Sequence, residues 1–355
     1  MFPSPAYVNA IATAVPDNDV HDRYIDFALA SMDRERDRRT LSRLIGRAQI
    51  DHRYSVLPRA TSSDGPAGVD LGRFYFADTT PDTAARMALY ERYALPLAER
   101  AIARLDPALV RRTTHLVLTS CTGFSAPGID LEIVERFDLE RSVERTIVGF
   151  MGCNAALNAL KLARHIVRSD DAATVLVVNL ELCSLHLQRP QGVEAALGYL
   201  IFADGCAASI VSREPHGIRL DAFGSSVIPE TAGHITWRVG SLGFDMHLST
   251  AVPRSIASAL SGARESVFGA RAPRADLWAI HPGGRAILDA VEDALALPTE
   301  ALERSRAILR AFGNMSSATI MFVFERMLGA GGADGWALAF GPGMSCESLR
   351  FSVAA

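Results

Sequence analysis

The 355-residue chain has a single lysine, Lys161, among its 36 basic residues. Because Lys161 lies within a helical pattern, the sequence gives little support to Schiff-base chemistry. The cysteines are odd in number, widely spaced and never arranged as a CxxC pair, which argues against a disulfide framework and against a zinc site. We therefore expect no metal and five free thiols, at Cys121, Cys153, Cys183, Cys206 and Cys346.

Long apolar runs and a strong charge of either sign are also missing. The net charge is -4, so nothing overall favours binding to nucleic acid or to a membrane surface. No uninterrupted apolar run approaches the ~20 residues of a membrane span. The N-terminal segment has no basic residues ahead of its apolar part, unlike a signal peptide. With 49% hydrophobic residues, we expect a soluble cytoplasmic protein with a sizeable core.

Several familiar motifs are absent or incomplete. No HExxH, EF-hand or P-loop pattern occurs. Residues 339–344 follow a predicted strand but lack the GxGxxG spacing, which argues against dinucleotide binding. Residues 123–128 resemble a serine elbow only loosely, because Pro127 stands where GxSxG requires a glycine.

Predicted strands alternate with predicted helices, which is typical of an α/β protein. Apolar runs predict buried strands over residues 114–120, 145–151, 173–182 and 206–212. Helical spacing covers residues 130–137 and 154–167.

The same order returns later in the chain, with a strand at 276–280 and a helix at 284–297. A Gly-Asn turn and a long apolar helix follow within 306–328, and the last strands lie in 335–345 and 347–353. The separation between Cys121 and Cys153 nearly equals that between His281 and Asn314. We interpret the chain as two similar βα-rich halves, residues 1–213 and 214–355, which pair as one five-layered body.

Cys153 stands between a predicted strand and a predicted helix. The free N–H groups and the dipole at a helix N-terminus favour the thiolate, which is the reactive form of cysteine. The neighbouring small residues, such as Gly152 and Ala155, leave room for a substrate. A packed structural cysteine is the alternative, and the local sequence does not decide between the two.

His281 and Asn314 also follow strands or precede helices, where sites gather in open α/β sheets. Pro282, Gly283 and Gly284 keep bulk away from the imidazole, which could activate a thiol or donate to an oxyanion. Asn314 alone is best explained as a helix N-cap, but beside a cysteine and a histidine it is a candidate oxyanion donor. For His186, the nearest rival histidine, we expect a solvated or core role.

Residues 33–59 are rich in arginine. Alternating charges over 33–39 indicate a solvated helix. For Arg47 and Arg53 we predict phosphate binding, because the guanidinium group matches phosphate oxygens.

With these residues in place, the chain resembles the type III polyketide synthases, the chalcone-synthase-like branch of the thiolase superfamily. The matching segments are "GFMGCNAALNALKLA", "LIFADGCAA", "WAIHPGGRAILD", "FGNMSSA" and "AFGPGMSCE". The resemblance covers nearly the whole chain. It implies a thiolase-like five-layered αβαβα fold, a homodimer, and a buried site at the end of a coenzyme A tunnel in each subunit.

The resemblance also implies a mechanism without metal or organic cofactor. Cys153 would carry the acyl group from acyl-CoA, while His281 and Asn314 would hold the malonyl-CoA thioester oxygen during decarboxylation. Phe202 matches the family's gatekeeper, and a second gatekeeper falls on Met246. The cavity lining implied by the resemblance is Cys121, Thr122, Ala126, Cys183, Trp237 and Ser316.

The product is less constrained by the sequence. The small Ala126 and the segment "ELCSLH" favour a bacterial synthase of long-chain alkylpyrones or alkylresorcinols. A malonyl-CoA-only synthase of tetrahydroxynaphthalene or phloroglucinol is the alternative, and Cys121 also fits it. Pro282-Gly283-Gly284 after the histidine argues against a β-ketoacyl-ACP synthase III. A cysteine hydrolase and a non-catalytic acyl-binding protein are the candidates from other classes.

Overall fold

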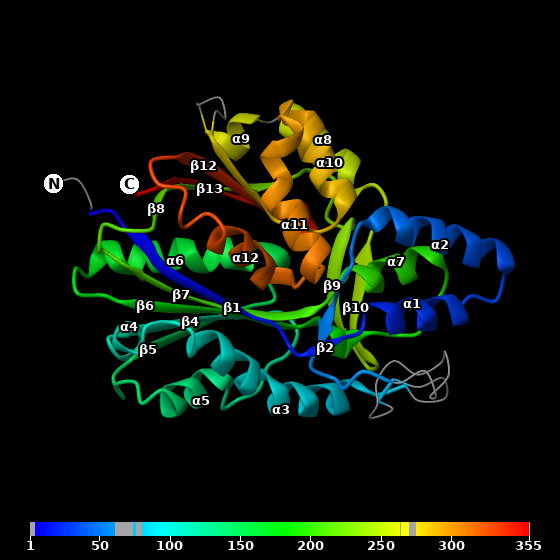
Figure 1. The fold of residues 1–355 in the computed structure, drawn as a ribbon, viewed down its shortest axis with the longest axis horizontal. Helices are drawn as coiled ribbons and strands as arrows, with labels where there is room; N and C mark the ends of the chain where they lie inside the picture. Colours follow the sequence, from blue (N-terminus) through cyan, green and yellow to red (C-terminus); the bar gives the residue numbers. More distant parts are fainter. Residues whose placement is uncertain (1–3, 61–73, 76–79, 263, 270–274, 355) are drawn as a thin grey trace.

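The computed structural model describes residues 4–60, 74–75, 80–262, 264–269 and 275–354. Within this part, nine strands form one sheet in the order β11-β12-β13-β8-β1-β7-β6-β4-β5 (Figure 1). Along the chain these strands are β1 (Tyr7–Ala14), β4 (His115–Ser120), β5 (Glu144–Gly149), β6 (Val175–Leu182), β7 (Asp204–Ser212), β8 (Ile218–Val227), β11 (Leu277–Ile280), β12 (Asp334–Gly341) and β13 (Ser345–Val353).

Three hydrophobic clusters divide the molecule into five layers. One cluster joins helices α3 (Thr83–Ile102) and α5 (Ile129–Arg136) to one face of β4, β6 and β7. A central cluster surrounds α6 (Ala155–Ser169) and α12 (Thr319–Glu325) and touches both parts of the sheet. The third covers β11 and β12 with α8 (Val252–Gly262) and α10 (Arg285–Leu295). The helices therefore lie below, between and above the two parts of the sheet, as Figure 1 shows, and the expected αβαβα order is confirmed.

The central strands are buried on both faces, which explains their nearly continuous apolar sequences. In β6, Val175 and Val177 enter the central cluster, while Leu176 and Val178 enter the cluster below. Successive side chains of a strand point to opposite faces, so each layer receives every second residue.

Strand β5 differs from the sequence prediction. It was expected to be buried, but it forms the edge of the sheet, and most of its residues are exposed in the single chain. Ile147 is 50% exposed. The prediction of a buried strand fails because an apolar run does not show whether the strand is covered by its own chain or by another one.

Further elements complete the described chain: α1 (His21–Ala30), α2 (Glu35–Ala48), α4 (Pro107–Arg111), α7 (Val193–Ile201), α9 (Arg264–Phe268), α11 (Glu303–Phe312), and the short strand pairs β2 (Asn18–Asp19) with β3 (Tyr54–Ser55) and β9 (Ile235–Gly240) with β10 (Gly243–Leu248). The predicted long helix after Asn314 is short, because α12 ends at Glu325. No helix in the described residues combines the length and apolar character that crossing a membrane requires.

Candidate active site

The parallel arrangement of strands brings the cysteines together. Strands β4, β5 and β6 run parallel, so their carboxyl ends lie at one edge of the sheet. Cys121 follows β4, and Cys183 follows β6. Cys153 follows β5 in the 3-10 turn η2 (Gly152–Asn154), which leads directly into α6. The predicted place of Cys153 at a strand-to-helix junction is confirmed.

The protonation of Cys153 differs from the expectation based on the helix N-terminus. Burial is the largest influence, and it raises the pKa of the thiol to about 11. Hydrogen bonds from the Ser316 and Asn314 side chains act in the opposite direction by stabilising the thiolate. Burial therefore favours the thiol form of Cys153, and a nucleophilic role would require a base.

His281 is the candidate base that the sequence predicts. It follows β11, is 2% exposed, and burial lowers its pKa to about 3, so the imidazole is neutral. Neither ring nitrogen hydrogen-bonds to any residue that the structure describes. Such a buried, unpaired group is costly unless a substrate supplies its partner.

Two hydrogen bonds hold the side chain of Asn314 in place. Its Oδ1 accepts from the Ser316 N–H at 2.8 Å, at the first residue of the 3-10 turn η5 (Ser316–Ala318), so the helix N-cap predicted from the sequence is not formed. This bond fixes the amide so that Nδ2 donates to the Gly283 carbonyl at 3.3 Å, two residues after His281. The amide nitrogen is thus held between the Cys153 side and the His281 side of the site.

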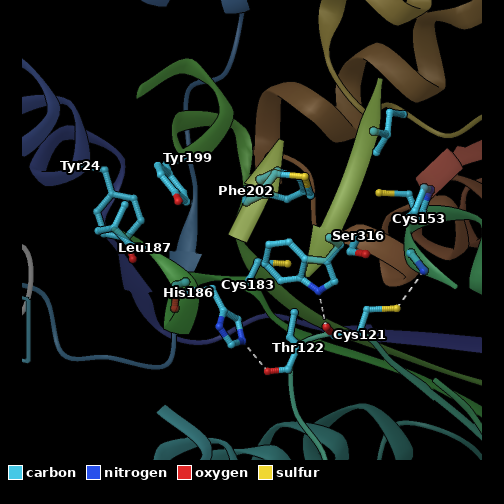
Figure 2. A pocket seen from close by; sticks show the side chains of 16 residues that line it. Tyr24, Cys121, Thr122, Cys153, Cys183, His186, Leu187, Tyr199, Phe202 and Ser316 are labelled. Atoms are coloured by element: carbon cyan, nitrogen blue, oxygen red, sulfur yellow. Dashed lines mark hydrogen bonds between the residues drawn. The ribbon is translucent and has the colours of Figure 1, made fainter. Parts of the chain in front are cut away.

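The cavity next to Cys153 has most of the predicted lining, without Ala126. Cys121, Thr122, Cys183, Phe202, Trp237, Met246 and Ser316 all line one pocket with Cys153, as Figure 2 shows for most of them. The Trp237 indole donates to the Cys121 carbonyl at 2.6 Å, and the Cys121 sulfur accepts from the Gly152 N–H at 3.0 Å. Burial raises the pKa of the Cys121 thiol well above its usual value, so this second sulfur remains protonated.

Several lining residues were not predicted. Tyr24, Leu187, Tyr199, Ile235 and Pro342 complete the wall. His186, expected to be solvated or in the core, is buried and also lines the pocket. Its Nδ1 accepts from the Phe244 N–H at 3.1 Å, so Nε2 carries the proton that is donated to the Thr122 carbonyl at 2.6 Å. Burial lowers its pKa to about 3, and this neutral ring braces the wall.

Glu181 is the main site feature that the sequence reading missed. This fully buried carboxylate on β6 accepts hydrogen bonds from the Cys121 N–H, the Thr122 hydroxyl and the Ser317 hydroxyl. Burial outweighs these bonds and raises its pKa to about 7. It ties the loop after β4 to η5, and so supports both walls beside Cys153.

Two predicted binding residues lie elsewhere. Arg53 cannot contact a phosphate outside, because it is fully buried and its guanidinium donates to His21 Nδ1 and to the carbonyls of Tyr199 and Phe202. It supports the backbone at Tyr199 and Phe202 instead. Ala126 is exposed on the surface of the single chain and is not part of the cavity wall.

A second cavity opens at the surface nearby. Gly283 and Gly284 line it together with Arg47 of α2 and residues of α7. A small hollow lined by Gly198, Tyr199 and Met246 shares wall residues with both cavities. The three hollows therefore lie next to one another, from Arg47 along α7 to the pocket that contains Cys153.

Both halves of the chain match models of one known family. The model described as "Chalcone and stilbene synthases, N-terminal domain" matches residues 3–215, and the corresponding C-terminal domain matches residues 220–354. The chain belongs to the chalcone and stilbene synthase family. It is therefore a type III polyketide synthase, an acyltransferase that uses acyl-CoA and malonyl-CoA in a decarboxylative condensation.

Relatives and solved structures agree with this assignment. "Alpha-pyrone synthesis polyketide synthase-like Pks18" of Mycobacterium tuberculosis, also found in Mycobacterium bovis, is 34% identical over 287 residues, which cover 76% of this chain and 73% of the relative. PKS-I from the brown alga Ectocarpus siliculosus is 28% identical, with a TM-score of 0.87 and 99% coverage of both chains. The type III domain of Steely1 from Dictyostelium has the same fold, at 23% identity, a TM-score of 0.87, and coverage of 99% of this chain and 100% of that chain. The thiolase-like fold is thus confirmed.

Proposed function

We propose that this enzyme loads a long-chain acyl starter on Cys153, extends it with malonyl-CoA and closes it to an alkylpyrone or alkylresorcinol. The proposal is supported by the apolar wall of the cavity and by the similarity to a relative named for alpha-pyrone synthesis. Figure 2 shows Tyr24, Tyr199 and Leu187 on the side of the pocket away from Cys153, with Phe202 and Cys183 between them. The wall is predominantly apolar, which suits an alkyl chain that starts at the sulfur.

In the loading step, neutral His281 takes the proton from the Cys153 thiol as the sulfur attacks the acyl-CoA carbonyl. The thioester bond of the starter then breaks, and His281 passes the proton to the coenzyme A thiolate as it leaves. The starter is now a thioester of Cys153, and the imidazole is neutral again.

In the extension step, the N–H groups of His281 and Asn314 hold the thioester oxygen of malonyl-CoA. Carbon dioxide leaves, and its bonding electrons form the enolate. The enolate carbon attacks the acyl carbonyl on Cys153, and the sulfur departs as the thiolate. Because the thioester itself stabilises the enolate, we propose that the reaction needs neither metal nor organic cofactor.

We further propose that coenzyme A enters by the surface cavity at Arg47. Arginine pairs well with phosphate oxygens, and this side chain is exposed at the mouth. Glycine at position 283 leaves this side of the imidazole uncovered, because a Cβ there would contact the ring, 3.5 Å from His281 Nε2. The cytoplasmic location is part of the same proposal.

A homodimer is supported by the edge of the sheet. The exposed side chains Phe124, Ile147, Phe150 and Met151 gather on and beside β5, the strand with a free edge. Exposed apolar edges of this kind are normally covered by another chain. A two-fold axis beside β5 would pair this strand with its copy and cover all four side chains.

The test is an incubation of purified protein with malonyl-CoA, alone and with acyl-CoAs from acetyl to stearoyl, read by mass spectrometry. We expect pyrones or resorcinols only with long starters. An aromatic product from malonyl-CoA alone would favour the alternative, a synthase that uses only malonyl-CoA. The presence of Cys121 in the cavity wall also fits that alternative. Free acids without condensation would mean a hydrolase.

A variant ties the result to the cavity. Leu187→Trp fills the end away from Cys153, so we expect the preferred starter to shorten by several carbons while acetyl-CoA loading stays unchanged. Leu131→Trp on the surface of α5 is the control and should keep the wild-type preference. An unchanged preference in Leu187→Trp would show that the chain lies elsewhere.

A further inference from the structure

We propose that one face of α2 is the docking surface for an acidic acyl carrier protein that delivers the starter. This inference rests on the proposed function, since it concerns how the acyl group reaches Cys153. The face, called here the arginine face, consists of Arg36, Arg39, Arg43 and Arg47. Their spacing of three, four and four residues places all four on one side of the helix, and all four are exposed.

Most of this positive charge is not neutralised within the chain. Arg39 pairs with Glu35, with Nε to Oε1 at 2.9 Å. Arg36, Arg43 and Arg47 form no ion pair with any residue for which the structure gives side chains. The whole chain carries -4, so this concentration of free arginine is local and contrasts with the rest of the protein.

The arginine face begins at the entrance to the active site. Arg47 lines the surface cavity whose wall includes Gly283 and Gly284, next to His281. A separate hollow lies further along α2 and is lined by Glu35, Arg36, Arg39, Thr40 and Arg43. In Figure 1, α2 lies beside α7 at one end of the molecule, with its outer side uncovered by any drawn element.

The length of the face distinguishes a protein from free coenzyme A. Arg36 and Arg47 are eleven positions apart, which corresponds to about 16 Å along a helix. The phosphates of one coenzyme A at the mouth can neutralise the arginines nearest Arg47. An acidic helix laid along α2 would instead face all four, and a carrier protein brings the same pantetheine arm to the same entrance.

A lipid surface fits these residues less well. Helices that bind membranes interleave basic residues with large apolar ones that enter the bilayer. None of the large exposed apolar side chains among the described residues lies on α2. The uniformly polar arginine face therefore matches an acidic protein, and electrostatic complementarity would set the rate of docking.

The test compares two donors of the same acyl group. Palmitoyl-loaded acyl carrier protein and palmitoyl-CoA are each mixed with the enzyme, and acylation of Cys153 is followed by intact-protein mass spectrometry. For Arg36→Glu/Arg39→Glu we expect transfer from the carrier protein to slow by about tenfold or more, and transfer from palmitoyl-CoA to stay within about twofold. Arg36→Gln/Arg39→Gln, which adds no negative charge beside Glu35, should show a smaller loss in the same direction.

Arg38→Glu is the matched control, because Arg38 lies on the same helix but outside the arginine face, and both rates should stay unchanged. An equal loss with both donors in the double variant, or no transfer from the carrier protein to the wild type, would overturn the inference. Arginine-dependent binding to phosphatidylglycerol vesicles without transfer from the carrier would assign the face to lipid. Condensation with palmitoyl-CoA would leave the proposed function standing in each of these cases.

Discussion

The backbone of Gly152 lies directly against the ring of Pro342. A Cβ on Gly152 would lie 2.2 Å from Pro342 Cδ. The φ of Gly152 is +77°, a left-handed backbone conformation that residues other than glycine rarely adopt. Gly152 immediately precedes Cys153, and Pro342 follows β12, so this contact joins the two parts of the sheet beside the proposed nucleophile. The position of the sulfur therefore depends on the absence of a single methyl group.

Gly152→Ala should displace Cys153 and reduce activity. We expect a loss of roughly 1–3 kcal/mol in the free energy of unfolding from backbone strain. Condensation should fall by about tenfold to a hundredfold, since small displacements of a reacting group are costly. Urea unfolding and steady-state rates measure both effects. Gly46→Ala, where no atom lies within 4 Å of the added Cβ, should keep full activity; an active Gly152→Ala protein would contradict this account.

His281→Gln tests the base. The thiol of Cys153 has a raised pKa and so depends on a neighbouring acceptor for its proton. We expect acyl loading at pH 7 to slow by about a hundredfold or more, with the remaining rate rising with pH as thiolate forms without assistance. Stopped-flow release of coenzyme A follows the step. The exposed His216→Gln should load normally, and a loading rate in His281→Gln equal to wild type would exclude the imidazole as base.

Glu181→Gln should change how stability depends on pH. Burial raises the pKa of Glu181 from its usual 4.5 to about 7, so the folded state binds more protons than the unfolded state between these values. The favourable contribution of the protonated form is complete below about pH 4.5 and is lost as the pH rises through about 7. The glutamine variant does not titrate, so its stability relative to wild type should increase between pH 5 and pH 8 by on the order of 2–3 kcal/mol.

Urea unfolding at each pH gives this difference. Glu132→Gln alters an exposed carboxylate on α5 and should follow the wild type at every pH. A constant difference between Glu181→Gln and wild type across this range would show that the carboxyl group titrates alike in both states.

Ile147→Lys tests the proposed dimer. Ile147 is half exposed at the centre of the β5 edge, and a buried lysine there would carry an unpaired charge across the two-fold axis. Sedimentation should show a dimer for wild type and for Ile147→Val, and mainly a monomer for Ile147→Lys. A wild-type monomer at micromolar concentration, or a dimer unaffected by the lysine, would contradict the proposed interface.

Several strands and helices after residue 114 could be predicted from the sequence, because buried strands appear as apolar runs and helices have their own spacing of apolar residues. Helix α7, strand β8 and helix α8 were not predicted. The strands at 173–182 and 206–212 agree with β6 and β7, and the helix at 154–167 agrees with α6. The exposure of β5 could not be predicted, because apolar residues look alike whether they are covered by the same chain or by another.

The three proposed catalytic residues could be chosen because each stands where a strand ends or a helix begins. The role of Glu181 could not be chosen in this way: it lies within the apolar strand β6, and its partners Thr122 and Ser317 are far away in the sequence. Arg53 shows the opposite error. Its charge suggested that Arg53 binds phosphate at the surface. Arg53 is instead buried and donates a hydrogen bond to the Phe202 carbonyl, and these tertiary contacts cannot be deduced from the sequence.

The most direct test of the central claim is the mass of the protein itself. After incubation with palmitoyl-CoA, the wild type should gain one palmitoyl group on the peptide that contains Cys153. Cys153→Ala should gain none and should form no condensation product, yet it should still release some carbon dioxide from malonyl-CoA, because His281 and Asn314 remain. Chain extension by Cys153→Ala, or acylation of a different cysteine such as Cys121, would contradict the assignment of Cys153 as the residue that carries the growing chain.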